Sequence, residues 1–236
     1  MNKDLIPKQL PLSIDLRDDC TLETFYAGSN HQVLDQIKLS AQGIGEQFIF
    51  LWGREGVGRS HLLQGACHFA GRQGITAVYL PLLDLLQREP TKLVEGLERL
   101  GLVCIDDIDA ICGQPIWEEA LFYLFNRLRT ANHRLIIAAN VPPKSLPLKL
   151  ADLQSRFSWG VTYQIQPLDD EQLIAALQLR AKQRGLELSK DVGAFLIRRF
   201  ARDMPHLYAL LDQLDKASLA AQRRLTIPFV KSVLSL

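Results

Sequence analysis

The chain has 236 residues with 27 Lys and Arg against 26 Asp and Glu, and this balance argues against a protein that grips nucleic acid through bulk electrostatics. Its 47% hydrophobic residues and 11 prolines exclude a disordered chain and suit one or two domains with a buried core. The N-terminal residues have acids and prolines where a secretory peptide needs an apolar run, and no later stretch approaches the ~20 apolar residues of a membrane span, so we expect a cytoplasmic protein without a membrane partner.

The first 22 residues show no sustained hydrophobic period and contain two prolines, so residues 1–22 are predicted to form a flexible tail. Asn30 is expected to be the N-cap of a helix, because apolar residues recur at helical spacing after it. Short apolar runs then alternate with segments of helical spacing. Strands are predicted over 48–52, 76–80, 102–106, 134–139 and 161–166, and helices over 59–72, from the second strand to about residue 99, and over 115–130.

Strict alternation of strand and helix indicates a parallel sheet with helices on both faces. We therefore expect an α/β domain over residues 23–167. Beyond Pro167 no strand-like run follows, and apolar residues recur only at helical spacing. Helices are predicted over 170–184, 189–201, 206–222 and 227–235, which makes residues 168–236 a small all-helical lid domain.

A glycine-rich segment directly follows the strand at 48–52 and directly precedes the helix at 59–72. It fits the pattern G-x-x-x-x-G-[KR]-S and consists of Gly53, Arg54, Glu55, Gly56, Val57, Gly58, Arg59 and Ser60. Glycines let successive N–H groups turn inward and the helix N-terminus adds a positive dipole, so the pattern predicts a phosphate-binding loop. We expect Ser60 to hold Mg²⁺, whereas Arg59 replaces the usual lysine with a bulkier group, which favours binding over hydrolysis. The alternative is a strand-to-helix turn without a ligand.

Two carboxylates end the apolar strand at 102–106, at the edge of the sheet where open α/β folds bind ligands. Asp106 is expected to hold Mg²⁺ through water together with Ser60. Asp107 stands where a carboxylate could orient or deprotonate a water. The alternative is a solvated strand end that caps a helix.

The segments FLWGREGVGRSHLL, LVCIDDID, LQSRFSWG, IQPLDDEQLIAALQLRA and LTIPFVK resemble the AAA+ family of P-loop proteins, in its DnaA branch. Within that branch the chain is similar to the DnaA-homologous regulatory inactivators of DnaA. The similarity runs from about Phe25 to Leu236. It implies a P-loop AAA+ fold with a parallel five-stranded sheet flanked by helices, followed by a helical lid.

The resemblance also implies functions for individual residues on the nucleotide side. Phe25 and Tyr26 would lie beside the base and ribose, and His61 would join the phosphate-binding loop in contacting the nucleotide. Asn140 would be the first sensor, which feels the terminal phosphate or its water. The alternative for Asn140 is a polar residue that starts a proline turn.

Arg156 matches the arginine finger, a residue offered to the nucleotide of a neighbouring subunit. Without the family match a surface ion pair would be the better explanation for Arg156. The chain departs from the family at the second sensor, where Pro205 replaces the arginine. Either Arg202 or His206 could substitute in contacting phosphate, and we assign Arg202 to the nucleotide site.

Gln9, Leu10, Leu12 and Ile14 lie in a segment similar to the peptide with which bacterial proteins bind the DNA polymerase III sliding clamp, its beta subunit. Leu12 and Ile14 offer apolar anchors, and Gln9 offers an amide for a polar subsite. The alternative is a leader without a partner.

The resemblance implies a regulator that holds ADP and Mg²⁺, has weak ATPase activity of its own at most, and associates with itself and with DnaA. Together with the DNA-loaded clamp it would stimulate hydrolysis of DnaA-bound ATP through Arg156 and so prevent re-initiation of chromosome replication. The alternative from a different class is an autonomous AAA+ ATPase or a helicase-loader-like protein. An origin-binding initiator would need a helix-turn-helix domain after the lid, which this sequence does not contain, so we expect no sequence-specific DNA binding.

Overall fold

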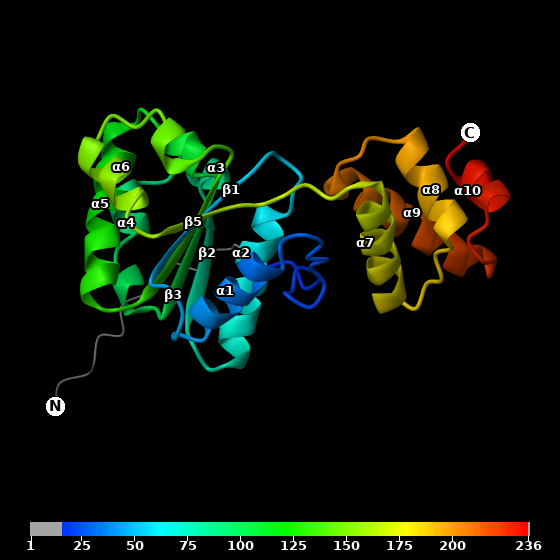
Figure 1. Cartoon of the computed structure of the whole chain (residues 1–236), viewed down its shortest axis with the longest axis horizontal. Helices are drawn as coiled ribbons and strands as arrows, with labels where there is room; N and C mark the ends of the chain where they lie inside the picture. The colour runs from blue at the N-terminus through cyan, green and yellow to red at the C-terminus, as the bar shows by residue number, and fades with distance from the viewer. Residues whose placement is uncertain (1–15, 236) are drawn as a thin grey trace.

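The computed structural model describes residues 16–235, which form an α/β domain and a helical lid domain joined by an extended linker (Figure 1). The N-terminal residues of this range lie between the two domains, next to helices of both. Within the described range no helix has both the length and the apolar character needed to cross a membrane.

Five parallel strands form the sheet of the α/β domain, in the order β2-β3-β4-β1-β5. They are β1 (Phe48–Trp52), β2 (Ala77–Pro81), β3 (Leu102–Asp106), β4 (Arg134–Ala139) and β5 (Val161–Gln164). Both faces of the central strands are covered, because Phe50 packs into one hydrophobic layer while its neighbour Ile49 packs into the other. The predicted five-stranded parallel sheet is confirmed.

Helices cover the two faces of the sheet, with α1 (His31–Ala41) and α2 (Arg59–Arg72) on one side and α5 (Pro115–Thr130) and α6 (Ala151–Phe157) on the other (Figure 1). The shorter helical segments are α3 (Leu82–Leu85), α4 (Pro90–Leu93), η1 (Leu97–Arg99), η2 (Ile108–Ile111) and η3 (Pro143–Ser145). The helical material expected up to about residue 99 consists of short pieces, as Pro90 and the left-handed Gly96 require.

The lid domain has its own hydrophobic core, built by four helices. They are α7 (Asp170–Gln183), α8 (Lys190–Arg199), α9 (Met204–Ala221) and α10 (Ile227–Val233). A side-chain N-cap begins each helix, since Asp169, Ser189, Asp203 and Thr226 accept hydrogen bonds from backbone N–H groups of the first turn. The predicted helical lid is confirmed.

One local prediction from the sequence is wrong, and another holds for the position of the residue but not for its side chain. Residues 16–22 are not a free tail, because Cys20 and Leu22 are 7% and 1% exposed and Leu22 packs against α2 at Gly65. Asn30 stands at the N-cap of α1 but its side chain does not cap the helix. The amide of Asn30 instead exchanges two hydrogen bonds with the backbone of Gln166, at 3.0 and 2.8 Å, and so ties α1 to the linker.

Candidate nucleotide-binding site

The glycine-rich segment forms the turn between β1 and α2, as the sequence predicted. Gly56 and Gly58 adopt φ angles of +79° and +100°, which residues with a Cβ avoid. A Cβ at Gly58 would lie 2.8 Å from Cε2 of Phe25, so the backbone can pass here only without a side chain. Gly58 is also the N-cap of α2 and offers no capping side chain. The first N–H groups of a 14-residue helix thus face the turn, an arrangement suited to an anion.

Arg59 supplies a buried positive charge to this turn and is only 7% exposed. Its Nη2 donates a hydrogen bond of 2.8 Å to Oδ1 of Asn140 at the end of β4. Its Nη1 is buried and has no hydrogen-bond partner among residues 16–235. A buried guanidinium nitrogen without a partner is costly, so this atom marks where a phosphate oxygen fits.

Asn140 is itself held by Asp109 of η2. The backbone N–H of Asn140 donates to both carboxylate oxygens of Asp109, at 3.1 and 2.9 Å, and its Nδ2 donates to Oδ2 at 3.2 Å. Both ends of the Asn140 amide are therefore occupied. Asp109 was not predicted, although it is the third acid of the run that begins with Asp106 at the end of β3.

Asp106 ends β3 and is completely buried. Its carboxylate accepts hydrogen bonds from the hydroxyl of Tyr79, at 2.9 Å, and from the backbone N–H of Asp107, at 3.0 Å. Burial and the neighbouring Asp106 raise the pKa of Tyr79, and the nearby Ser60 opposes this effect. Tyr79 was not predicted, because it is part of an apolar strand whose neighbours the sequence does not reveal. Its hydroxyl lies beside both expected Mg²⁺ ligands, Ser60 and Asp106.

The described residues contain no group of three or more His, Cys, Asp or Glu side chains that could hold a metal ion alone. Magnesium usually keeps waters and takes phosphate oxygens in addition to one or two protein ligands. A hydroxyl and one carboxylate therefore fit Mg²⁺ if a nucleotide completes its coordination.

Asp107 adopts a left-handed backbone conformation, with φ of +54°. Burial and the adjacent Asp106 raise the pKa of Asp107 to about 6, against the opposing effect of Arg59. Asp109 and Asp84 raise it further. Asp107 is therefore a half-buried carboxylate that can exchange a proton near neutral pH.

Residues 25–30 form the other wall of the site. The ring of Phe25 packs edge-on against His61 with 5.5 Å between centroids, and Tyr26 lies half-buried beside it. Gly28 lies against the linker, since a Cβ there would come within 2.7 Å of Leu168. The structure thus brings together the residues expected beside a base and those expected around phosphate.

The lid reaches the phosphate-binding loop through the start of α9. A Cβ at Gly56 would lie 3.4 Å from Cβ of Asp203 and 3.8 Å from Cδ of Pro205, so the proline occupies the position beside the loop. Arg202 forms an ion pair of 3.0 Å with Asp170 at the start of α7, and its side chain is 61% exposed. The N–H of His206 donates to the capping Asp203 at 2.8 Å. Arg202 is thus engaged with α7.

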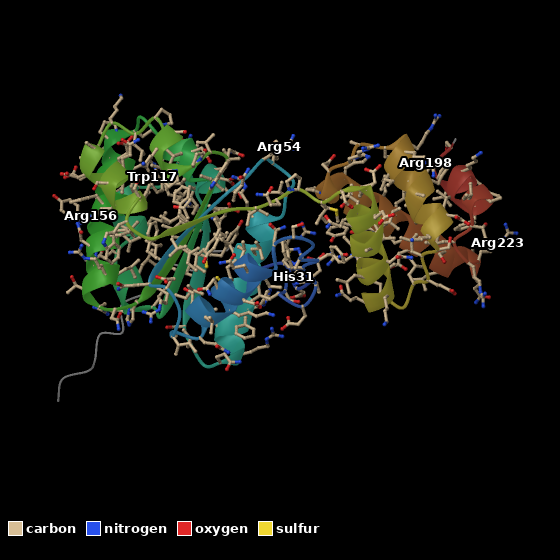
Figure 2. The ribbon with its side chains drawn as sticks, viewed as in Figure 1. His31, Arg54, Trp117, Arg156, Arg198 and Arg223 are labelled. Carbon is tan, nitrogen blue, oxygen red and sulfur yellow. The ribbon has the colours of Figure 1, made fainter. Side chains whose placement is uncertain are left out.

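Arg156 lies in the last turn of α6, a helix that was not predicted from the sequence. The seven residues of α6 make only about two turns, too few for the apolar spacing to predict a helix. The guanidinium carbon lies 5.9 Å from the ring centre of Phe122, and Nε is buried without a partner among the described residues. Figure 2 shows Arg156 at the edge of the α/β domain that faces away from the lid, whereas Arg54 of the phosphate-binding loop lies beside the lid. The segment with Gln9, Leu10, Leu12 and Ile14 lies outside the described residues.

Family models match almost all of the described chain. Residues 16–164 match the bacterial DnaA ATPase domain, and residues 169–234 match the lid domain of Hda. Among solved structures, AMPPCP-bound DnaA from Aquifex aeolicus is 26% identical, with a TM-score of 0.73 over 86% of this chain and 67% of that chain. Domain III of the replication initiation protein DnaA from Thermotoga maritima is 20% identical, with a TM-score of 0.77 over 94% of this chain and 98% of that one.

Proposed function

The chain belongs to the family of bacterial DnaA ATPase domains, and on that premise we propose that it switches off DnaA by completing the ATPase site of DnaA with its own Arg156. It is a DnaA-related replication protein with an AAA+ nucleotide-binding fold and the lid domain of Hda. In the proposed function it holds a nucleotide to fix its own shape, docks on ATP-bound DnaA and promotes hydrolysis there. The consequence is restraint of re-initiation.

One observation carries this proposal: Arg156 lies on the edge of the α/β domain opposite to the chain's own phosphate-binding loop (Figure 2). An arginine on that edge can reach only a nucleotide on another molecule. Among residues 16–235 its buried Nε has no hydrogen-bond partner and its guanidinium lies over the ring of Phe122, so the side chain is supported but retains donors for phosphate. An arginine supplied in trans stabilises charge on the transferring phosphoryl group and raises rates by ~10³–10⁵-fold.

We further propose that the chain's own site holds ADP with Mg²⁺. The first N–H groups of α2 and Nη1 of Arg59 would bind the phosphates, and Ser60 and Asp106 would hold the cation. When bound, Mg²⁺ supplies shielding of the phosphate charge. A third phosphate would lie near carboxylates and would lack hydrogen-bond donors. Asp109 already accepts the hydrogen bonds of the Asn140 N–H groups, and the lid places Asp203 beside Gly56. This arrangement supports a diphosphate and weak hydrolysis by the chain itself.

The segment with Gln9, Leu10, Leu12 and Ile14 is proposed to tether the protein to the sliding clamp on DNA, which would place it beside newly replicated DNA. This proposal rests on the sequence. We also propose that the chain associates with itself through the edges of its AAA+ domain. A cytoplasmic location follows from the proposed partnership with DnaA.

The decisive experiment measures hydrolysis of DnaA-bound ATP with and without DNA-loaded clamp. Arg156→Ala should abolish the stimulation while leaving ADP binding and clamp binding unchanged. Arg129→Ala is the matched control, because this substitution removes the same charge from an exposed arginine of α5. The guanidinium carbon of Arg129 lies 5.8 Å from the ring centre of Trp159. Stimulation that survives in Arg156→Ala would eliminate the finger assignment.

Asp107 favours a second function, an autonomous AAA+ ATPase. A carboxylate with a pKa of about 6 beside Arg59 is suited to take a proton from an attacking water. Single-turnover hydrolysis of ATP by the isolated chain separates the two functions. Turnover at the rates usual for P-loop ATPases, abolished by Asp107→Asn, would favour the autonomous enzyme over the regulator.

A further inference from the structure

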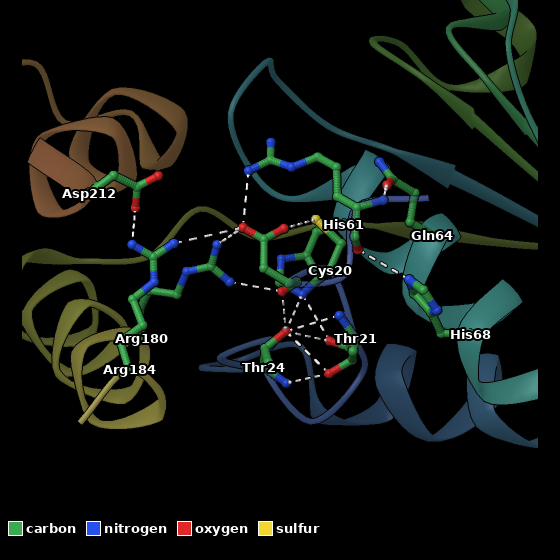
Figure 3. A network of polar contacts seen from close by, with 11 residues as sticks. Cys20, Thr21, Thr24, His61, Gln64, His68, Arg180, Arg184 and Asp212 are labelled. Atoms are coloured by element: carbon green, nitrogen blue, oxygen red, sulfur yellow. Dashed lines mark hydrogen bonds and ion pairs between the residues drawn. The ribbon is translucent and has the colours of Figure 1, made fainter. Parts of the chain in front are cut away.

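Residues 16–25, here called the strap, run between the α/β domain and the lid (Figure 1). The strap is packed rather than loose, since Leu22 joins the hydrophobic layer under α2. Figure 3 shows that its polar groups bond in two directions, to α2 on one side and to α7 on the other. The strap directly follows the segment proposed to bind the clamp and directly precedes the wall of the nucleotide site.

On the α2 side the strap holds the first turn of the helix that begins at the phosphate-binding loop. Nε2 of His61 lies 2.8 Å from the carbonyl oxygen of Thr21 and 2.9 Å from the hydroxyl of Thr24. The backbone N–H of Arg17 donates to Oε1 of Gln64 at 2.9 Å, one turn further along α2. A shift of the strap would therefore disturb residues adjacent to the phosphate-binding loop.

On the lid side a single carboxylate makes the connection. Asp19 pairs closely with Arg180 and lies 4.0 Å from Arg184, and its backbone carbonyl accepts a 2.8 Å hydrogen bond from Nη1 of Arg180. The Arg180 side chain is only 3% exposed and its guanidinium lies 4.9 Å from the ring centre of Tyr208 on α9. Arg184 also pairs with Asp212 of α9. Asp19 is thus paired directly with α7 and linked through Arg184 to α9.

Within residues 16–235, Asp19 is the only carboxylate that pairs with Arg180. Loss of one partner of a buried ion pair leaves the other charge uncompensated, which is costly in free energy. Without Asp19, a lid position that exposes Arg180 to water would therefore be favoured. Such a movement would also withdraw the start of α9 from Gly56, where the lid meets the phosphate-binding loop. The ion pair at Asp19 and the closure of the lid over the nucleotide site therefore depend on each other.

We propose that Asp19 is a positioning residue for the nucleotide site. By holding Arg180 and Arg184, it closes the lid against the phosphate-binding loop, and it couples the chain segment before the strap to bound nucleotide. This coupling rests on the proposed function, because the sliding clamp is the partner proposed for that segment. A clamp that favours the position of the strap in which Asp19 holds Arg180 also favours the closed lid, so ADP binds more tightly.

Calorimetric titration of the full chain with ADP and Mg²⁺ tests the positioning. Asp19→Asn should weaken ADP binding at least about tenfold, and Asp19→Glu, which keeps the charge, should restore the affinity to within about threefold of the wild type. Glu23→Gln is the matched control, since its exposed 2.7 Å ion pair with Arg72 joins the strap to α2 and does not reach the lid. Asp19→Asn with wild-type affinity, or Glu23→Gln with an equal loss, would overturn the proposal.

Circular dichroism and urea denaturation first establish that each variant is folded. If Asp19→Asn does not fold, Arg184→Gln replaces it, because this change removes the more exposed partner and leaves Arg180 paired. We then expect a smaller loss of ADP affinity in the same direction. An unchanged affinity in folded Arg184→Gln would count against the proposal.

The coupling is tested by measuring ADP affinity with and without saturating clamp. In the wild type the clamp should strengthen ADP binding at least about fivefold, and in Asp19→Asn it should change the affinity by less than twofold. A clamp that binds the chain without altering ADP affinity would overturn the coupling. If the clamp does not bind at all, the proposed tether and the coupling both fail, whereas the ADP titration of Asp19→Asn still decides the positioning.

Discussion

Arg59 and Asn140 are joined by a hydrogen bond of 2.8 Å although 81 residues separate them in the chain. The bond links the phosphate-binding loop after β1 to the end of the neighbouring strand β4. Because Asn140 is also fixed by Asp109, the guanidinium of Arg59 is held in one orientation. In that orientation Nη1 has no hydrogen-bond partner among residues 16–235. An arginine in the place of the usual lysine is therefore a positioned ligand for an anion.

This geometry predicts that Arg59→Met, which keeps the length and removes the charge, weakens ADP binding by about 1.5–3 kcal/mol, or roughly 10- to 150-fold. The loss arises because charge-assisted hydrogen bonds to phosphate disappear. Calorimetric titration measures it. Arg54→Met is the control, since Arg54 is exposed in the same loop, and an equal loss in both variants would show that only bulk charge matters.

Tyr79→Phe removes the hydroxyl that donates to the buried Asp106 at 2.9 Å. We expect a loss of about 1–3 kcal/mol in the free energy of unfolding, because a buried carboxylate loses a hydrogen bond. Urea denaturation of the nucleotide-free protein checks this. Tyr163→Phe on the edge strand β5 makes the same chemical change at a half-exposed position and should cost less than about 0.5 kcal/mol.

Asp107 predicts a dependence of stability on pH. Its pKa is raised from 3.8 to about 6, so between these values the folded protein retains a proton that the unfolded chain has lost. Stability therefore falls as pH rises through this window, and the penalty is complete above it. After allowance for partial solvent exposure the penalty is about 1 kcal/mol.

Asp107→Asn should accordingly stabilise the nucleotide-free protein by about 1 kcal/mol at pH 7.5 and have little effect near pH 3.5, where the carboxyl is protonated in both states. Urea denaturation at the two pH values gives the comparison. Asp152→Asn, an exposed acid on α6, serves as the control. A stabilisation of equal size at both pH values would refute the electrostatic cause.

Gly58→Ala should destabilise the protein and abolish nucleotide binding, because the residue has φ of +100° and its new Cβ would lie 2.8 Å from Phe25. The left-handed conformation alone costs about 1–2 kcal/mol. Gly71→Ala in the last turn of α2 meets no atom within 4 Å and should instead stabilise by about 0.5–1 kcal/mol. Thermal unfolding with and without ADP measures the stability and the nucleotide binding of both variants. Equal shifts of the unfolding temperature in Gly58→Ala and Gly71→Ala would contradict the strain at Gly58.

The sequence predicted the elements whose signals are local. Short apolar runs identified the strands, and 3.6-residue spacing identified the lid helices, because burial on two faces or on one stripe leaves that pattern in any fold. The phosphate-binding loop was also predictable, since its glycines and the helix that follows are consecutive. Prediction was poorest for short segments such as α6, where seven residues carry too little periodicity.

Only the tertiary structure decided which distant side chains meet. Tyr79 joins Asp106 across two strands, and Asp19 reaches Arg180 across 161 residues. Sequence spacing carries no record of such contacts, because the partners are brought together by the packing of the domains and not by local chain geometry. The chain by itself therefore specified a glycine-rich loop and a lid, whereas the contacts of the strap with both domains, and the position of Arg156 away from that loop, emerged only when the elements were packed.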